Sequence, residues 1–386
     1  MTTEKHNFAP LYRAFILLCL FCAFSRPSEA AVTADSSSAV IFLYQRVGED
    51  TLPQGNLSLD RFQEHIRELT TGGYSVLPLP EIIAAIREDK PLPEKTVGIT
   101  FEGAYLATLK NALPLLDEAK LPFTVFFSSD MADGGNPSHM TWDQLKDLKK
   151  DGLASFGLLP SAYTHMADLD ADRAAALINK ARSRYTEMMG ESAVFFSWPY
   201  GEYSSALKKQ LATYDFKASF GQQSGVVYAG SDFTALPRFT MTDAYGDLDR
   251  FLLTANALAL PVSEVVPDDT LIAENPPIIG FTVAPEITNL GELSCFGSSL
   301  GKIAVTRLGN RIEMRPDQPF EDRRTRINCT LPESTVIPGE SQRWRWFGMI
   351  LIAKAISDEQ PPEPADAPAT EESPKAPDAS GPEEDF

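Results

Sequence analysis

The chain has few of the residues from which metal and thiol sites are built. Among its 386 residues are four cysteines and four histidines. The histidines are His6, His65, His139 and His165. No two of them lie four residues apart, so a two-histidine metal site would need residues distant in sequence. No glycine-rich phosphate loop is present, which disfavours a nucleotide-binding fold.

An excess of positive charge is also missing. The formal net charge is -19 at pH 7, which gives no electrostatic reason to expect nucleic acid as a partner. About half of this charge lies in residues 358–386, where ten acidic residues face the single Lys375. The same segment is rich in proline, so we expect a disordered acidic tail there.

Long hydrophobic runs are scarce as well. The run from Ala14 to Phe24 has eleven residues, too few for a comfortable membrane span of ~20. Arg13 precedes it, and Ser28-Glu29-Ala30 places small residues where a signal peptidase reads them. The pattern predicts a signal peptide over residues 1–30, export to the periplasm or the extracellular space, and no stable membrane span after cleavage. An uncleaved anchor is the alternative.

The two cysteines outside the predicted signal are Cys295 and Cys329. In an exported protein an isolated pair favours a disulfide over a metal site. The bond would close a loop of ~35 residues, which the chain-entropy model values at a few kcal/mol of stability.

Strand-like apolar runs alternate with helical patterns over residues 39–273. The runs at 41–44, 97–101, 123–127 and 194–198 read as strands, and 171–189 reads as a long helix that ends at Gly190. Thr141 and Gln144 form a candidate capping box for another helix. This alternation predicts an α/β domain with a parallel sheet covered by helices.

The pattern changes after residue 273. Asn275-Pro276-Pro277 is a linker-like break, and only short strand candidates follow it. Residues 275–357 are therefore predicted to form a small antiparallel, sandwich-like β-domain. In this domain Arg323-Arg324-Thr325-Arg326, with Trp344 and Trp346, is a candidate ligand patch. A solvated strand face with core tryptophans is the favoured interpretation of the same residues.

Several segments resemble, in order and spacing, the motifs of the polysaccharide deacetylase family, the nodulation-protein-B homology domain. Thr100-Phe101-Glu102-Gly103-Ala104-Tyr105 resembles its first motif, where the family has Thr-Phe-Asp-Asp, then Gly or Ala, then Tyr. The other matching segments are 42–47, 73–79, 121–127, 140–145, 198–203 and 236–239. The resemblance covers about residues 39–239 and implies a (β/α) barrel.

The resemblance also implies metal-dependent removal of N-acetyl groups from a polysaccharide. In the family the first Asp is the general base, and the second Asp with two histidines at i and i+4 holds a divalent metal. Here Glu102 stands at the general-base position and Gly103 at the metal position, while Leu159 and Tyr163 fall at the histidine positions. Glycine and leucine cannot ligate a metal through their side chains, and a neutral tyrosine is a poor ligand.

Two further residues bear on the lost chemistry. Gln45 replaces the histidine that usually ends the opening strand, and His165 lies two residues past a ligand position. A surface or turn role is favoured for His165 over a surviving ligand role. Taken together, these departures predict a domain without a metal cofactor; zinc is expected only if an active enzyme uses an unusual ligand set.

The same positions lie at or just past the ends of predicted strands, where parallel α/β barrels form their sites. We expect a cleft lined by residues whose aromatic faces and polar groups suit a glycan: Tyr44, Gln45, Tyr105, Trp198, Tyr200 and Arg238. The alternative places Tyr44, Tyr105 and Trp198 in the core with satisfied polar tips.

Three functions are compatible with these features. The favoured one is an exported pseudoenzyme of this family that binds a polysaccharide or glycan in the barrel cleft. The first alternative is an active metal-dependent hydrolase of N-acetyl groups. The second is an interaction module that acts through the β-domain.

Overall fold

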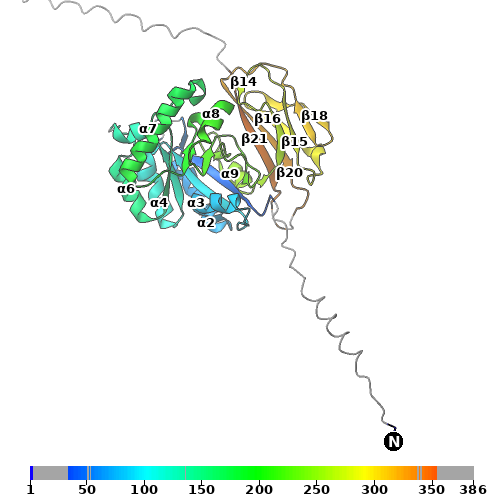
Figure 1. The fold of residues 1–386 in the computed structure, drawn as a ribbon, viewed down its shortest axis with the longest axis horizontal. Coiled ribbons are helices and arrows are strands. Elements are labelled where there is room, and N and C mark those ends of the chain that lie inside the picture. Colours follow the sequence, from blue (N-terminus) through cyan, green and yellow to red (C-terminus); the bar gives the residue numbers. More distant parts are fainter. Residues whose placement is uncertain are drawn as a thin grey trace, which may run out of the picture.

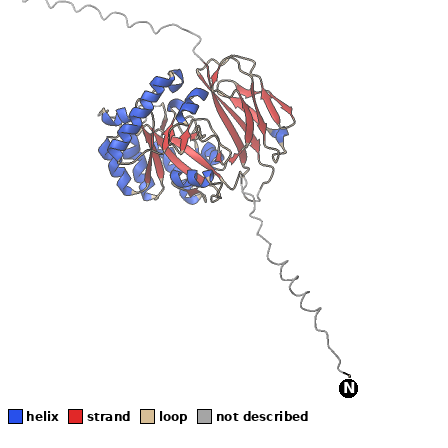
Figure 2. Ribbon diagram, viewed as in Figure 1, coloured by secondary structure: helices blue, strands red, loops and turns tan. Residues whose placement is uncertain are grey.

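The computed structural model describes residues 1–2, 34–49, 52, 54–134, 136–336, 339 and 341–353. It consists of a helix-covered sheet and a β-sandwich that pack side by side (Figures 1 and 2). The predicted signal peptide beyond residue 2 and the predicted acidic tail lie outside the described residues. No described helix has the length and apolarity that crossing a membrane requires.

The first domain is built on a nine-stranded sheet that curls into a partial barrel, which confirms the predicted α/β class. The main path runs β10-β1-β5-β6-β7-β8-β9, with β11 also beside β1 and β4 also beside β5. All pairs are parallel except β1 with β10. The strands are β1 (Ser38–Tyr44), β4 (Ser75–Val76), β5 (Thr96–Glu102), β6 (Phe123–Phe127), β7 (Ala154–Leu158), β8 (Phe195–Ser197), β9 (Ala218–Phe220), β10 (Val227–Tyr228) and β11 (Phe239–Thr240). A separate parallel pair joins β2 (Arg46–Val47) and β3 (Asn56–Leu57).

Helices cover the outer face of this sheet (Figure 2). Because they bury one face while side chains fill the inside of the curl, every residue of β5 and β6 is buried. The helices are α2 (Leu59–Thr71), α3 (Leu79–Arg87), α4 (Leu113–Glu118), α5 (Ser129–Asp133), α6 (Trp142–Asp151), α7 (Ala171–Met189), α8 (Ser205–Leu211) and α9 (Leu248–Ala255). Short π or 3-10 turns are η1 (Thr108–Ala112), η2 (Met166–Asp168), η3 (Pro199–Gly201) and η4 (Leu290–Glu292).

Two of the predicted helix signals are confirmed. Thr141 caps α6, and its side chain and that of Gln144 form the reciprocal bonds of a capping box. Gly190 follows α7 with φ of 75°, a left-handed conformation that glycine adopts without strain.

The segment 236–240, called the closing segment below, joins the two edges of the curled sheet. At one end the Leu236 amide donates to the Ser219 carbonyl of β9 at 2.7 Å. At the other end Phe239 pairs in parallel with Phe42 of β1. Arg238 lies between these two anchors, so the closure itself delivers a guanidinium group to the end of the barrel.

The second domain is the predicted β-sandwich, with one core between two sheets. Ile279, Phe281 and Ile312 of one sheet pack with Ile327 and Leu351 of the other, all nearly or fully buried. The larger sheet has the order β12 (Leu258–Ala259), β21 (Trp344–Ala353), β20 (Arg324–Pro332), β16 (Ser294–Gly297), β17 (Gly301–Ile303), with β14 (Leu271–Ile272) also on β21. The smaller sheet has the order β13 (Val262–Val266), β15 (Ile279–Val283), β19 (Arg311–Met314), β18 (Val305–Leu308).

The boundary between the domains lies earlier than the sequence suggested. β12, β13 and β14 precede residue 275 yet pair with strands of the sandwich. The expected division at residues 273–275 therefore falls inside the β-domain, and the last barrel helix ends at Ala255. Strands of two to five residues carry too little alternation to be recognised, and the Asn275-Pro276-Pro277 break is a connection within the sandwich.

The two domains share a close interface. β12 pairs in parallel with β21, and the ring of Phe239 packs edge-on against that of Trp346, with centroids 5.2 Å apart. Gly348 of β21 lies against the carbonyl oxygen of Ser224 in the barrel, where a Cβ atom would not fit. The backbones of the two domains therefore meet directly along this line.

The predicted disulfide is present and joins β16 to β20. Cys295 and Cys329 are directly opposite each other in the antiparallel pair, and both are fully buried. The bond locks the register of these two strands, both of which contribute to the site described below.

We predict that the double variant Cys295→Ala/Cys329→Ala unfolds with a free energy lower by about 2–4 kcal/mol, because the bond restricts the unfolded chain. Thermal unfolding followed by circular dichroism measures the change. Reductant should lower the midpoint of the natural protein and leave that of the double variant unchanged. Equal midpoints for the oxidised and reduced natural protein would contradict this prediction.

Candidate functional site

The end of β5 places Glu102 at the centre of a buried hydrogen-bond network. Its Oε1 atom accepts from Tyr163 Oη at 3.0 Å and from Gln222 Nε2 at 2.9 Å. Its Oε2 atom accepts from Ser197 Oγ and from Arg238 Nη2, both at 2.6 Å. The side chains of Glu102 and Arg238 are both 0% exposed, so the two charges form a fully buried ion pair.

The partners of Glu102 come from separate strand ends. Ser197 is the last residue of β8, Tyr163 lies in the loop after β7, Gln222 follows β9, and Arg238 comes from the closing segment. The carboxyl ends of parallel strands meet at one edge of a barrel, which is why residues so far apart in sequence converge here. The guanidinium of Arg238 also lies over the rings of two buried phenylalanines, which adds favourable cation–π contacts.

This environment removes the features that a general base needs. Each carboxylate oxygen of Glu102 already accepts two hydrogen bonds, and the Arg238 guanidinium neutralises its charge. A catalytic base needs an accessible lone pair within reach of the proton that it removes. Glu102 therefore acts here as a hydrogen-bond acceptor within the fold. The carboxylate at the general-base position is ion-paired and has no access to solvent.

The residues at the three positions expected for metal ligands have other structural roles. Gly103 has φ of 109°, and a Cβ atom built there would overlap the ring of Tyr105. Leu159 is fully buried in an apolar cluster. The hydroxyl of Tyr163 is engaged with Glu102, and burial together with that carboxylate raises the pKa of Tyr163 well above its usual value, which disfavours a phenolate.

The residues present do not fit the divalent metal that the motif resemblance implies. In the part of the chain that the structure describes, no group of three or more His, Cys, Asp or Glu side chains is arranged to hold a metal ion. At the positions that would supply such ligands, Gly103 has only a hydrogen atom, Leu159 an isobutyl group and Tyr163 a protonated phenol.

His165 belongs to an ionic chain between the domains. Its Nδ1 atom lies 2.9 Å from Glu202 Oε2, and its ring stacks on Tyr200 with centroids 4.2 Å apart. Glu202 also binds Arg323 of the sandwich at 3.1 Å, and Arg323 binds Asp168 at 2.8 Å. His165 is the residue before η2, and its side chain is 45% exposed.

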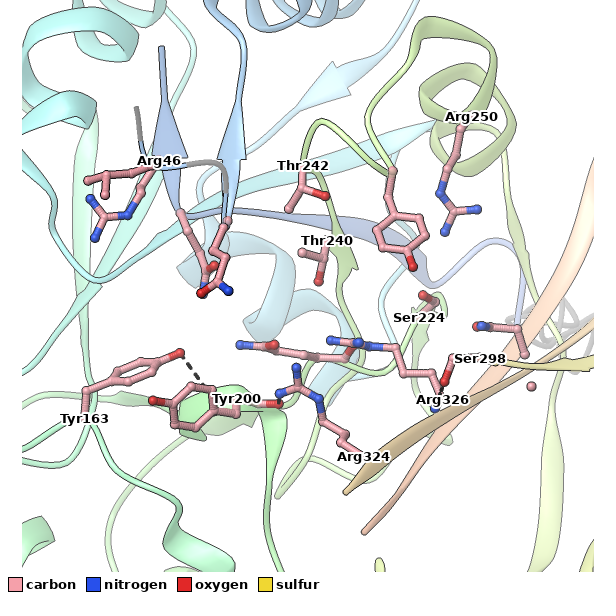
Figure 3. A pocket seen from close by; sticks show the side chains of 18 of the residues that line it. Arg46, Tyr163, Tyr200, Ser224, Thr240, Thr242, Arg250, Ser298, Arg324 and Arg326 are labelled. Atoms are coloured by element: carbon pink, nitrogen blue, oxygen red, sulfur yellow. Dashed lines mark hydrogen bonds between the residues drawn. The ribbon is translucent and has the colours of Figure 1, made fainter. Parts of the chain in front are cut away.

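A cavity of about 1030 Å³ lies over the network, between the barrel and the sandwich. Tyr163 and Gln222 belong to both the network and the cavity wall. Figure 3 shows Arg324 and Arg326 reaching from the sandwich toward Tyr200 and Thr240 of the barrel. Figure 3 also shows Arg46 and Arg250 on the barrel side of the same space.

The structure brings together some of the expected glycan-contacting residues and separates the rest. Gln45, Tyr105 and Tyr200 line the cavity. Tyr44 and Trp198 do not, which corrects that expectation: both are 0% exposed in the core. Their polar tips are satisfied by His65 Nδ1 at 3.0 Å from Tyr44 Oη and by the Thr234 carbonyl at 2.8 Å from Trp198 Nε1.

Arg238 also departs from its expected role, because it is sealed beneath the cavity by its bonds to Glu102 and Ser197. The cavity instead uses Gln222, Tyr245 and Arg250, which the motifs did not point to. Gln222 lies just past the end of β9, whereas Tyr245 lies in a loop and Arg250 in α9, where no strand-end pattern marks them.

Comparisons with known proteins show which proteins the barrel domain is similar to. Residues 89–219 match the model of the family described as Polysaccharide deacetylase. The chain is 22% identical over 177 residues to the Bacillus subtilis protein YxkH, named as a candidate polysaccharide deacetylase; the match covers 46% of this chain and 62% of YxkH. The chain thus spans less than two thirds of that relative.

Two further matches cover most of the other protein. A poly-beta-1,6-N-acetyl-D-glucosamine N-deacetylase of Staphylococcus aureus is 22% identical over 217 residues, covering 52% of this chain and 73% of that enzyme. Among solved structures, the Streptococcus pyogenes deacetylase PplD in complex with acetate aligns with a TM-score of 0.53 and 17% identity. That alignment covers 56% of this chain and 98% of PplD, and it shows the shared fold.

We predict that Arg238→Met lowers the free energy of unfolding by about 3–5 kcal/mol, because it leaves the Glu102 carboxylate buried without a counterion. Urea denaturation measures the loss. The double variant Glu102→Gln/Arg238→Met should be less destabilised than Arg238→Met alone, since no uncompensated charge remains.

The matched control for this prediction is Lys120→Met. It breaks the exposed ion pair with Asp117, whose atoms lie 2.9 Å apart, and exposed pairs contribute at most about 1 kcal/mol. Arg238→Met and Lys120→Met with the same stability would show that the buried pair does not carry the role described here.

Proposed function

We propose that this chain, whose barrel is a domain of the polysaccharide deacetylase family, is an inactive member of that family that binds a saccharide in the cavity between barrel and sandwich. One observation carries the proposal. Glu102, at the position of the general base, is sealed in an ion pair with Arg238 directly beneath a cavity of about 1030 Å³.

The loss of catalysis rests on the absence of each element that the reaction needs. An N-deacetylase must activate a water molecule and stabilise the oxyanion that forms on the acetyl group. Gly103, Leu159 and Tyr163 offer no ligand set for a metal that would do both. Glu102 has no free acceptor site from which to remove a proton.

Saccharide binding rests on the lining of the cavity. Tyr105, Tyr200 and Tyr245 contribute aromatic rings, against which the apolar faces of sugar rings pack. Gln45 and Asn328 contribute amide groups that can bond sugar hydroxyls. A few polar groups among aromatic walls in a concave site is the usual composition of a small-ligand pocket.

The sandwich takes part in the same site. It supplies Phe296, Ser298 and Asn328 to the cavity wall, together with the two arginines of β20. In this proposal the sandwich forms one wall of the cavity. It is therefore part of the saccharide site and does not act as a separate interaction module.

We predict that the purified protein, incubated with zinc, cobalt or nickel, releases no acetate from N-acetylated oligosaccharides and retains no equivalent of metal after desalting. Isothermal titration calorimetry with neutral and acidic oligosaccharides should nevertheless detect binding to at least one of them. Acetate release that Glu102→Gln abolishes would establish an active hydrolase instead. Failure of every saccharide to bind would refute the binding half of the proposal.

We predict that Tyr245→Ala weakens saccharide binding by about two- to tenfold, because it removes one ring from the cavity wall and ring packing is worth about 0.5–1.5 kcal/mol. Tyr245 is 52% exposed, so its truncation leaves the core intact. The control is Tyr214→Ala, which removes a tyrosine outside the cavity. An unchanged affinity in Tyr245→Ala would exclude this wall from the site.

Export is also part of the proposal, and it rests on the N-terminal pattern together with the disulfide. N-terminal sequencing of the protein secreted by its natural host should begin at Ala31. A chain that begins at Met1 and stays with the cells would contradict it.

A further inference from the structure

The charge of the cavity differs sharply from that of the whole chain. The chain carries a formal net charge of -19. Arg46, Arg250, Arg324 and Arg326 nevertheless line the cavity, and no aspartate or glutamate lies among its described lining residues. A wall of this composition creates a positive potential inside a concave, partly enclosed space, where it is less screened than on an open surface.

Three of these arginines lack a carboxylate within ion-pair distance among the described residues. Arg46 pairs with Glu49 at 2.6 Å. Within the described residues, Arg250, Arg324 and Arg326 form no ion pair. Arg324 Nη1 donates to the Tyr200 carbonyl at 2.6 Å and Arg326 Nε to the Gln222 carbonyl at 3.5 Å. A guanidinium has five N–H donors, so most of them remain for a ligand.

Holding the guanidinium groups of the cavity arginines close together costs electrostatic free energy. Arg324 and Arg326 lie two residues apart on β20, on the same face of the strand and about 7 Å from each other. Burial, and then the neighbouring Arg324, lowers the pKa of Arg326 to about 10. Burial also lowers the pKa of Arg250, whose Nε atom is buried without a hydrogen-bond partner among the described residues. An anion in the cavity would relieve this strain.

Other arginines at the domain interface show what a purely structural role looks like in this protein. Arg345 binds Asp35 at 2.7 Å and Glu333 at 2.5 Å, and Arg323 binds both Asp168 and Glu202. Arg345 and Arg323 thus each have two carboxylate partners, whereas Arg343 crosses the same interface to the Asn256 carbonyl at 3.0 Å. Arg324 and Arg326 also reach across the interface, to carbonyl oxygens of the barrel, but within the described residues neither has the carboxylate partners that Arg345 and Arg323 have.

The cavity arginines are also paired with tyrosines. The guanidinium carbon of Arg46 lies 3.7 Å from the centroid of the Tyr105 ring. That of Arg250 lies 5.5 Å from the ring of Tyr245, and that of Arg324 lies 6.0 Å from the ring of Tyr200. In these three pairs the guanidinium lies over the ring, so the cavity wall places a cation for a charged substituent next to an aromatic side chain.

We propose that the ligand of this cavity is an acidic oligosaccharide, in which neighbouring sugar rings carry carboxylate or sulfate groups. This inference rests on the proposed saccharide-binding function and adds the charge of the ligand to it. The sugar rings pack against Tyr105, Tyr200 and Tyr245, and the acidic groups bind the adjacent guanidinium groups, which match planar oxyanions in two-point hydrogen bonding.

Isothermal titration calorimetry tests the proposal with four probes: a galacturonic acid tetramer, a sulfated tetrasaccharide, neutral N-acetylchitotetraose and inorganic phosphate. We expect at least one of the two acidic tetramers to bind tenfold or more tightly than the neutral one. Phosphate alone should bind more weakly than that acidic tetramer. Raising NaCl from 50 to 500 mM should weaken the acidic ligand several-fold and leave the neutral one nearly unchanged.

Variants separate the arginine contribution from folding. Arg324→Gln and Arg250→Gln come from different domains, and each should lower affinity for the acidic tetramer at least tenfold, a larger factor than for the neutral tetramer. Arg307→Gln is the matched control, because Arg307 is exposed on β18, outside the cavity. Thermal unfolding of each variant checks that it folds.

The outcomes distinguish the two levels of the proposal. If neither acidic nor neutral saccharides bind, the proposed function fails and this inference fails with it. If the neutral tetramer binds as tightly as both acidic ones and the arginine variants change nothing, the function stands and this inference is overturned. Phosphate binding as tight as that of the acidic tetramers would also overturn it, because the site would then recognise a free anion.

Discussion

The buried pair of Glu102 and Arg238 is the interaction on which the organisation of the site depends. It connects the end of β5 to the closing segment, and Ser197 and Gln222 tie two more strand ends to the same carboxylate. An unpaired charge in this position would be strongly destabilising. Loss of one partner of the pair would therefore lower the stability of the fold. The Glu102 carboxylate thus holds several strand ends of the barrel together.

The site above this network is a product of two domains. The barrel alone would leave the strand ends open to solvent, and the sandwich covers them with β16 and β20. The bond between Cys295 and Cys329 joins those two strands, and β20 carries Arg324 and Arg326 toward the barrel. The shape of the cavity therefore depends on how the domains dock as much as on any one motif.

The sequence was informative where a pattern is local. Gly190 marks the end of α7, and Glu102 followed by Gly103 marks an altered strand end. It was uninformative where the outcome depends on distant partners: Glu102 and Arg238 are 136 residues apart, and no local signal says that they pair. The alternation around Arg324 predicts which face of a strand it occupies, but the identity of the surface opposite that face is set by domain packing.

Gly348 carries a consequence for how such a site can change over evolutionary time. It lies outside the cavity, yet its backbone rests on the carbonyl of Ser224, a residue of the cavity wall. Any side chain at position 348 would push the two domains apart. Substitutions at this one position can therefore change the width of the cavity over evolutionary time, although the position does not line it.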